Sequence, residues 1–128
     1  MVFLGLEEIL ILHDIQIQKY GGLEGVRDLT LLESAIQRPQ TSFDGKDLYS
    51  TIFDKAAALC MSLIQNHSFI DGNKRTGIYA ALVFLELNGH ILTVSTNELL
   101  NLTLNIANKK VNIEELSNFF EKKSVKLK

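Results

Sequence analysis

Residues 66–76 read Asn-His-Ser-Phe-Ile-Asp-Gly-Asn-Lys-Arg-Thr, and they lie between two of the most apolar segments of the chain. Eight of these eleven side chains can hydrogen-bond or ionise. In the preceding segment, apolar residues recur at steps of three and four from Leu48 to Leu63, which predicts a helix. A second helix is predicted over residues 74–88, and Gly89 ends it. A loop between two buried helices has little reason to be this polar unless it lines a cavity.

Helical spacing dominates the rest of the chain, and Pro39 is its single proline. The further predicted helices cover residues 6–17, 31–38, 97–108 and 113–122. Thr30 and Asp47 are the predicted N-caps of the second and third helices. Residues 41–47 are expected to form a loop or a short extended flap, and residues 91–94 a short strand or an extended segment.

These elements predict an all-α fold, a compact orthogonal bundle of about six helices in a single domain over residues 1–128. The helix over residues 74–88 is apolar nearly all round, so we expect it at the centre of the bundle. Strands and helices do not alternate along the chain, which argues against a Rossmann-like nucleotide-binding fold.

The composition is that of a packed globular protein, with 46% apolar and 22% charged residues. Cys60 is the single cysteine, and we interpret it as a buried apolar residue of a protein in the reducing cytoplasm. The net charge of −2 argues against direct nucleic-acid binding. The most apolar stretch, residues 77–87, is too short to cross a membrane, and no signal peptide is predicted. Six of the last 20 residues are lysines, which we interpret as a solvated tail.

The polar stretch places anion-binding groups at the start of a helix. The first N–H groups of the helix near Lys74 lack intrahelical partners and carry partial positive charge, which suits phosphate, and Gly72 allows close approach. Lys74 and Arg75 add positive charge where the helix dipole disfavours it, and an anionic ligand would remove this conflict. Asp71 would repel a phosphate unless Mg²⁺ lay between them. His67 is the candidate general base.

The residues alone therefore predict phosphoryl or nucleotidyl transfer. In this interpretation His67 deprotonates an attacking hydroxyl and Asp71 holds the metal. The phosphates contact the helix N-terminus together with Asn73, Lys74 and Arg75.

The same stretch resembles the signature of the Fic/Doc family, His-x-Phe-x-(Asp/Glu)-Gly-Asn-Gly-Arg-x-x-Arg. The chain departs from this pattern twice, because Lys74 replaces the glycine after the asparagine and Ile78 replaces the second arginine. Both departures are those of the Doc (death-on-curing) branch, whose motif contains Asn-Lys-Arg. The resemblance extends from about residue 9 to about residue 110 and includes Tyr20-Gly-Gly-Leu-Glu-Gly near the N-terminus.

The resemblance implies a Doc-like toxin of a toxin–antitoxin module, which uses ATP and Mg²⁺ to phosphorylate a protein hydroxyl. The family's acceptor is a threonine of elongation factor Tu, whose phosphorylation arrests translation. By family matching, His67 is the base, Asp71 is the Mg²⁺ ligand, and residues 41–46 correspond to a flap that positions the acceptor. Phe69 is apolar and is expected to anchor the loop in the core. The nucleotide-binding residues would be Gly72, Asn73, Lys74 and Arg75.

Two departures from the Fic pattern favour ATP bound in the opposite direction to that in the Fic enzymes. Lys74 puts a long side chain into the phosphate cradle, and Ile78 removes a partner of the distal phosphates. The family's internal inhibitory helix carries the pattern (Ser/Thr)-x-x-x-Glu-(Gly/Asn). In this chain Ser117 and Glu121 have that spacing, but Lys122 follows them in place of Gly or Asn, so an internal inhibitory helix is not found. The resemblance therefore implies inhibition in trans by a separate antitoxin, with a helix docked in a groove.

Two other functions stay open at this point. An AMP transferase is consistent with the intact part of the motif, and a protein that only binds the antitoxin and tunes operator binding would need no catalysis. His13-Asp14 lacks the further ligands of an HD phosphohydrolase, and His13 is expected in the core with a hydrogen-bond partner. Arg27 and Asp28 are expected to form a structural ion pair near the site, and a phosphate-side role for Arg27 is the alternative.

Overall fold

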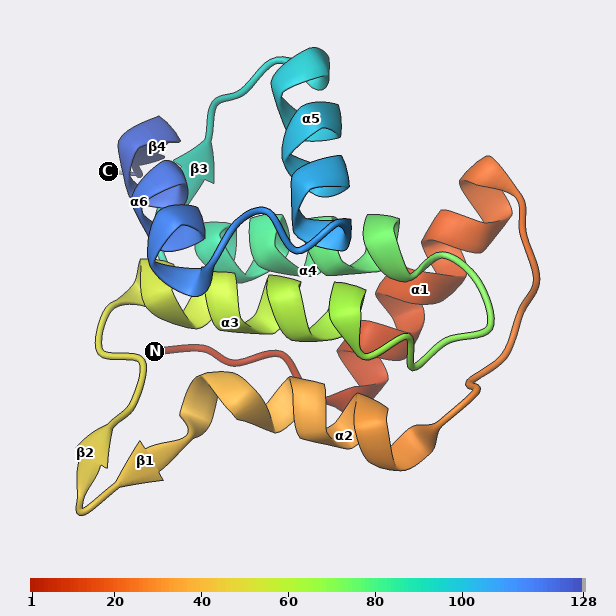
Figure 1. Cartoon of the computed structure of the whole chain (residues 1–128), viewed down its shortest axis with the longest axis horizontal. Helices are drawn as coiled ribbons and strands as arrows, with labels where there is room; N and C mark the ends of the chain where they lie inside the picture. The colour runs from red at the N-terminus through yellow and green to blue at the C-terminus, as the bar shows by residue number, and fades with distance from the viewer. Residues whose placement is uncertain (128) are drawn as a thin grey trace.

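The computed structural model describes residues 1–127, and over that range α-helices form most of the protein (Figure 1). The helices are α1 (Leu6–Tyr20), α2 (Leu29–Gln37), α3 (Ile52–Gln65), α4 (Asn73–Leu87), α5 (Thr96–Ala107) and α6 (Ile113–Lys123), with a short 3₁₀ helix at Arg38–Gln40. Two small antiparallel sheets pair β1 (Ser42–Phe43) with β2 (Lys46–Asp47), and β3 (His90–Leu92) with β4 (Ser124–Lys126). The predicted all-α fold is therefore confirmed, and each predicted helix is present.

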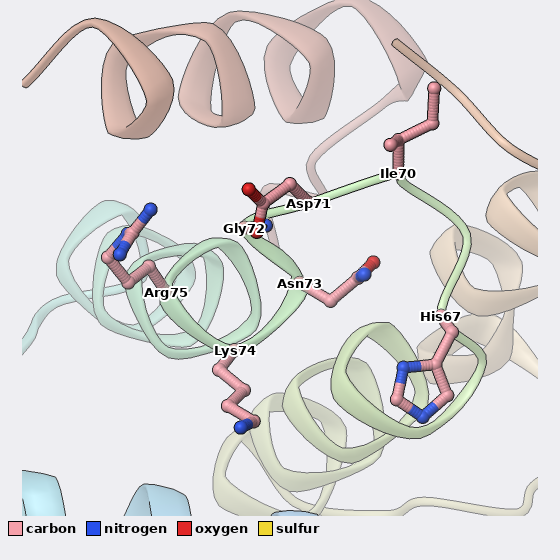
Figure 2. Close-up of a pocket in the computed structure, with 7 residues that line it drawn as sticks. All are labelled: His67, Ile70, Asp71, Gly72, Asn73, Lys74 and Arg75. Carbon is pink, nitrogen blue, oxygen red and sulfur yellow. Dashed lines mark hydrogen bonds between the residues drawn. The ribbon is translucent and has the colours of Figure 1, made fainter. Parts of the chain in front are cut away.

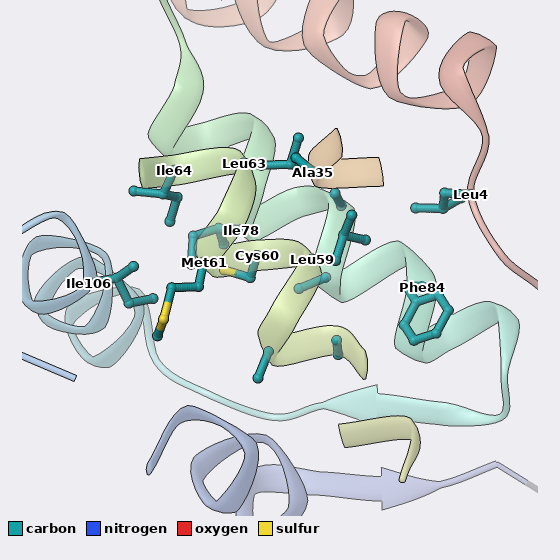
Figure 3. Packing of buried hydrophobic residues seen from close by; sticks show 14 of the residues in the cluster. Leu4, Ala35, Leu59, Cys60, Met61, Leu63, Ile64, Ile78, Phe84 and Ile106 are labelled. Atoms are coloured by element: carbon teal, nitrogen blue, oxygen red, sulfur yellow. The ribbon is translucent and has the colours of Figure 1, made fainter. Parts of the chain in front are cut away.

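Helix α3 is the centre of the bundle. Every residue from Lys55 to Ile64 is buried, and α2, α4, α5 and α6 all pack against this helix (Figure 1). Figure 3 shows the apolar side chains of α3 in the middle of the core. Helix α4 lies beside α3 and also packs against α1, β3 and α5, and only Lys74, Glu86 and Leu87 of this helix are exposed, in agreement with its predicted central position. None of the described helices is both long and apolar enough to cross a bilayer.

Helices α3 and α4 approach each other closely at Gly77. A Cβ atom at this position would lie 2.6 Å from Cγ1 of Ile64 and 3.0 Å from the carbonyl oxygen of Cys60. Cys60 itself is fully buried, as predicted, and burial raises the pKa of its thiol well above the usual range. The thiol therefore serves as a small apolar side chain in the core.

The N-caps of α2 and α3 differ from the predicted ones. Asp28, not Thr30, caps α2, and its Oδ1 accepts from the backbone N–H of Leu31 at 3.0 Å. Thr51, not Asp47, caps α3, in a reciprocal arrangement with Asp54. At α3 the physical reason is that a capping box satisfies two backbone donors, whereas a single carboxylate satisfies one. At α2 the helix begins at Leu29, so Thr30 lies inside its first turn.

The predicted extended flap is the β1–β2 hairpin, and a buried lysine holds its base. Lys55 is only 3% exposed, and its Nζ donates to Asp47 Oδ2 at 3.1 Å and to the carbonyl oxygen of Tyr49. The hairpin lies at the N-terminal end of α3, and the 66–72 loop lies at the opposite end (Figure 1). Fourteen residues of α-helix separate the two, about 20 Å. The predicted acceptor-positioning role of residues 41–46 therefore finds no support in the geometry.

The C-terminal residues form a strand and not a solvated tail. Strand β4 pairs with β3 in the register Ile91 to Val125, and Lys123 makes an ion pair with Glu98 at 2.9 Å. The prediction of a tail was wrong because the partner strand is more than 30 residues away in sequence. Lys128 lies outside the described residues.

We expect Gly77→Ala to lower the free energy of unfolding by about 1–3 kcal/mol, because the added methyl group overlaps α3. The usual preference for alanine within a helix, about 1 kcal/mol, has the opposite sign. Urea denaturation followed by circular dichroism measures the change. Gly5→Ala is the control, since its methyl group would meet only the Glu8 side chain at 3.6 Å. An unchanged midpoint for Gly77→Ala would show that α3 and α4 can separate without cost.

Candidate active site

The polar stretch forms a loop between the C-terminus of α3 and the N-terminus of α4. It lines a cavity of about 370 Å³ (Figure 2). The lining residues are His67, Ile70, Asp71, Gly72, Asn73, Lys74 and Arg75. The structure thus brings six of the seven predicted site residues to one cavity, and the seventh, Phe69, is buried in the core.

The N-terminus of α4 carries backbone donors that no side chain caps. Gly72 is the N-cap, with a φ of 77° in the left-handed region, and it supplies no side chain. The first intrahelical bond joins the N–H of Thr76 to the carbonyl oxygen of Gly72 at 3.0 Å. The N–H groups of Asn73, Lys74 and Arg75 therefore have no intrahelical acceptor, and the partial positive charge of the helix dipole gathers there. This arrangement suits an anionic group.

His67 follows the C-cap of α3, at a position where helices usually carry glycine. Its φ is 51°, so a residue with a Cβ atom adopts the left-handed conformation. This conformation costs roughly 1–2 kcal/mol for an L-residue. The imidazole is exposed and lies across the cavity from Asp71 (Figure 2). The side chain of His67 therefore reaches the cavity at a cost in backbone strain.

Two backbone N–H groups hold the Asp71 carboxylate. Oδ2 accepts from Leu23 at 3.2 Å and Oδ1 accepts from Gly72 at 2.8 Å. These bonds, helped by the charge of Arg75, lower the pKa of Asp71. Gly22 makes room for the carboxylate, because a Cβ atom there would lie 2.7 Å from Oδ2. The carboxylate is thus ionised and oriented in advance.

Asn73 and Phe69 brace the loop from within. The Asn73 side chain accepts from the N–H of Phe69 at 2.9 Å and donates to its carbonyl oxygen at 3.0 Å. The side-chain amide of Asn73 is therefore occupied by the loop. Only the backbone N–H of Asn73 remains for the predicted contact with phosphate. Phe69 is 1% exposed and stacks on His13, with ring centroids 3.7 Å apart. Its burial is what an anchor of the loop requires.

The two basic residues lie differently. Lys74 is exposed, and its side chain points away from Asp71 (Figure 2). Arg75 turns towards the end of α1, where it donates to the carbonyl oxygen of Gly21 at 3.0 Å and lies over the ring of Tyr20. The C-terminal carbonyls of α1 favour a cation, which offsets part of the conflict between Arg75 and the N-terminus of α4.

Three residues outside the motif contact the loop. From the sequence, His13 and Gly22 were not assigned to it, and Arg27 was expected near the site but with other partners. His13 is buried, as predicted, and its Nε2 hydrogen-bonds the carbonyl oxygen of Asp71 at 2.8 Å. Gly22 contributes the space described above. Arg27 makes no ion pair with Asp28, contrary to the prediction; it donates to carbonyl oxygens of the loop, and Asp28 caps α2. The HD dipeptide and the basic residue were visible signals, but their partners lie about 40 or more residues away in sequence.

A second cavity of about 440 Å³ lies beside the first, and its lining is more apolar. It is bounded by the end of α1, one face of α4 and the start of α5. The residues that line it are Tyr20, Arg75, Ile78, Tyr79, Val94, Ser95, Thr96, Leu99, Leu100 and Thr103. Arg75 lines both cavities.

A helical bundle with this loop at the junction of its two central helices is the arrangement that the Fic/Doc resemblance implies. The chain belongs to the Fic/DOC family, whose model matches residues 3–85. Over 111 residues it is 32% identical to the "Protein kinase doc" of Escherichia phage P1, an alignment that covers 87% of this chain and 86% of that protein. Over 70 residues it is 51% identical to "Toxin Doc" of Mycolicibacterium smegmatis, covering 55% of this chain and about half, 54%, of that relative.

We expect His67→Gly to be more stable than His67→Ala by about 1 kcal/mol, because glycine adopts a positive φ without a Cβ clash. Both variants lose the imidazole, so their difference isolates the backbone strain. Urea denaturation of the two variants measures it. The matched pair His90→Gly and His90→Ala, on the extended strand β3, should show the reverse order. Equal stability of the two His67 variants would show that this backbone is not strained.

Proposed function

We propose that the chain is a Doc-type protein kinase and the toxin of a toxin–antitoxin module. It transfers the γ-phosphoryl group of ATP to a protein hydroxyl. The observation that carries this proposal is the placement of His67, Asp71 and the uncapped N-terminus of α4 around one cavity. Two relatives support it, because one is named a protein kinase and the other a toxin. The proposed acceptor is a threonine of elongation factor Tu in the cytoplasm, and its modification would arrest translation.

In the proposed reaction the acceptor hydroxyl gives its proton to an imidazole nitrogen of His67 while its oxygen attacks the γ-phosphorus. The new O–P bond forms as the bond between the γ-phosphorus and the β–γ bridging oxygen breaks, and ADP leaves with that oxygen. The imidazole is exposed at the cavity, so a hydroxyl on a second protein can reach it. Positioning and charge neutralisation supply most of the catalysis in this chemistry.

The phosphates of the nucleotide would lie at the N-terminus of α4, against the free backbone N–H groups and beside Gly72. Lys74 and Arg75 would add positive charge there. Gly72 is needed there because its backbone is left-handed. In any other residue, the Cβ atom would lie only 3.2 Å from Cδ1 of Ile17.

Asp71 fits the role of a Mg²⁺ ligand. Each of its carboxylate oxygens accepts one N–H and keeps a lone pair free. Within residues 1–127 no three His, Cys, Asp or Glu side chains gather into a metal site. The ion would therefore be shared between one carboxylate and the phosphate oxygens, which is the usual ligand set of Mg²⁺ in phosphotransferases. When bound, it would neutralise phosphate charge.

The direction of the nucleotide separates the kinase from an AMP transferase. Ile78 is 4% exposed and part of the core, so this position offers no group to a distal phosphate. Lys74 stands exposed at the cavity. Both observations favour transfer of the γ-phosphoryl group. AMP transfer stays the second candidate because a helix N-terminus holds any phosphate of the nucleotide.

The proposed partner is a separate antitoxin that places a helix in the apolar second cavity. Leu99, Leu100 and Tyr79 line it, and they suit the apolar face of an amphipathic helix. Because Arg75 lines both cavities, an occupant of the second would contact a proposed nucleotide-binding residue.

We expect elongation factor Tu to gain the mass of one phosphoryl group when it is incubated with the protein, ATP and Mg²⁺. Intact-mass spectrometry measures the gain. His67→Ala should abolish it, whereas His90→Ala, which alters a histidine on β3 outside the cavity, should not. A gain of adenylyl size would establish the AMP transferase instead. No gain on this acceptor with the wild-type protein would contradict elongation factor Tu as the substrate, and would favour another acceptor or a protein that only binds its antitoxin.

We expect Asp71→Asn to raise the Mg²⁺ concentration that gives half-maximal transfer by about tenfold or more, because a neutral amide replaces the charged ligand. A titration of activity against Mg²⁺ at fixed ATP measures this. Asp14→Asn is the control, since Asp14 is an exposed carboxylate outside the cavity. An unshifted Mg²⁺ curve for Asp71→Asn would remove Asp71 from the metal site.

A further inference from the structure

The segment between α1 and α2 runs along the motif loop and is bonded to it through the backbone. The N–H groups of Arg27 and Asp28 both donate to the carbonyl oxygen of Ser68, at 2.7 and 3.0 Å. The N–H of Ile70 donates to the carbonyl oxygen of Gly25 at 3.1 Å. These bonds hold the backbone of Arg27 next to the loop, within reach of its side chain.

The Arg27 guanidinium binds the C-terminal end of α3. Its Nε donates to the carbonyl oxygen of His67 at 2.7 Å, and its Nη2 donates to the carbonyl oxygen of Asn66 at 3.2 Å. The last carbonyl groups of a helix lack intrahelical donors and carry partial negative charge. A guanidinium can reach two adjacent carbonyl oxygens at once because its donors form a rigid fork.

These two bonds hold the backbone on either side of His67, which is the strained residue of the loop. The conformation of His67, with a φ of 51°, persists only when its surroundings hold it. The bond from Arg27 Nε fixes the plane of the peptide that follows His67, and the bond to Asn66 fixes the plane of the peptide that precedes it. The direction of the Cα–Cβ bond of His67 then follows from these two planes.

We propose that Arg27 is a positioning residue, which holds the backbone of His67 left-handed so that the imidazole faces the cavity. For its consequence on the reaction, this inference rests on the proposed function. Arg27 does not line the cavity of the proposed nucleotide site, so its effect passes through His67 and not through the phosphates. Arg27→Ala should therefore lower kcat and leave KM for ATP unchanged.

The first experiment measures kcat and KM for ATP with Arg27→Ala, Arg27→Lys and Arg27→Gln. We expect kcat of Arg27→Ala to fall by about tenfold or more, with KM for ATP changed less than about twofold, because small misplacements of a reacting group are costly. Lysine should restore little, since one ammonium cannot reproduce the fork. Free guanidinium ion should raise kcat of Arg27→Ala but not that of His67→Ala. An unchanged kcat, or a rise in KM for ATP alone, would overturn the inference.

The second experiment does not depend on activity. In isotope-labelled protein without nucleotide, the backbone coupling constant and Cα shift of His67 report its φ. We expect both to leave the left-handed range in Arg27→Ala, and to remain there in Arg38→Ala, whose arginine contacts Tyr49 and Ser62 instead of the loop. Unchanged His67 signals in Arg27→Ala would overturn the inference. Should Arg27→Ala be unfolded by circular dichroism, Arg27→Lys and Arg27→Gln carry the same comparison.

The two experiments separate this inference from the proposed function. If the wild-type protein transfers nothing from ATP, the kinase proposal fails and the His67 signals still decide the role of Arg27. If the wild-type protein is active and Arg27→Ala is equally active with unchanged His67 signals, the role of Arg27 fails and the kinase proposal stands.

Discussion

The contact of α3 with α4 at Gly77 is the constraint on which the rest of the structure depends. With no side chain at Gly77, the two helices approach until the methyl group of alanine would overlap Ile64. Because the two helices are consecutive, this contact also brings the C-terminus of one to the N-terminus of the other (Figure 1). The end of α3 supplies a histidine, the start of α4 supplies free N–H groups, and the cavity lies between them. The site is thus a consequence of how two buried helices pack.

The loop at this junction is held by contacts that lie outside it. His13 bonds the carbonyl oxygen of Asp71, the N–H of Leu23 bonds its carboxylate, and Arg27 bonds the loop at His67. All three come from α1 or the segment that follows it. A loop with a left-handed histidine and basic residues at a helix N-terminus would not keep this shape by its own preferences. Helix α1 and the segment that follows it therefore hold the loop in its observed conformation.

This arrangement explains which features the sequence could predict. Periodicity located all six helices, since each apolar face recurs within one segment, and the polar composition of residues 66–76 identified the lining of the cavity. The features that were predicted wrongly depend on which of several partners a side chain binds, or on partners that are far away in the sequence. Asp47 is a residue type that often caps helices, but in the structure its carboxylate binds Lys55. Strand β4 forms only by pairing with β3, so its own residues give no strand signal. Arg27 was expected to pair with its neighbour Asp28, but the backbone carbonyls it binds leave no mark in a sequence.

Arg75 lines both cavities and would therefore contact both of their proposed occupants. Its guanidinium is tied to the carbonyl oxygen of Gly21 and lies over Tyr20, and Tyr20 lines the apolar cavity. Its Nε is buried without a hydrogen-bond partner among the described residues, so the side chain is not fully satisfied where it stands. A ligand phosphate on one side and an apolar helix on the other would both act on this one side chain. If the two proposed occupants favoured different contacts of the same guanidinium, competition for the position of Arg75 would couple the two cavities.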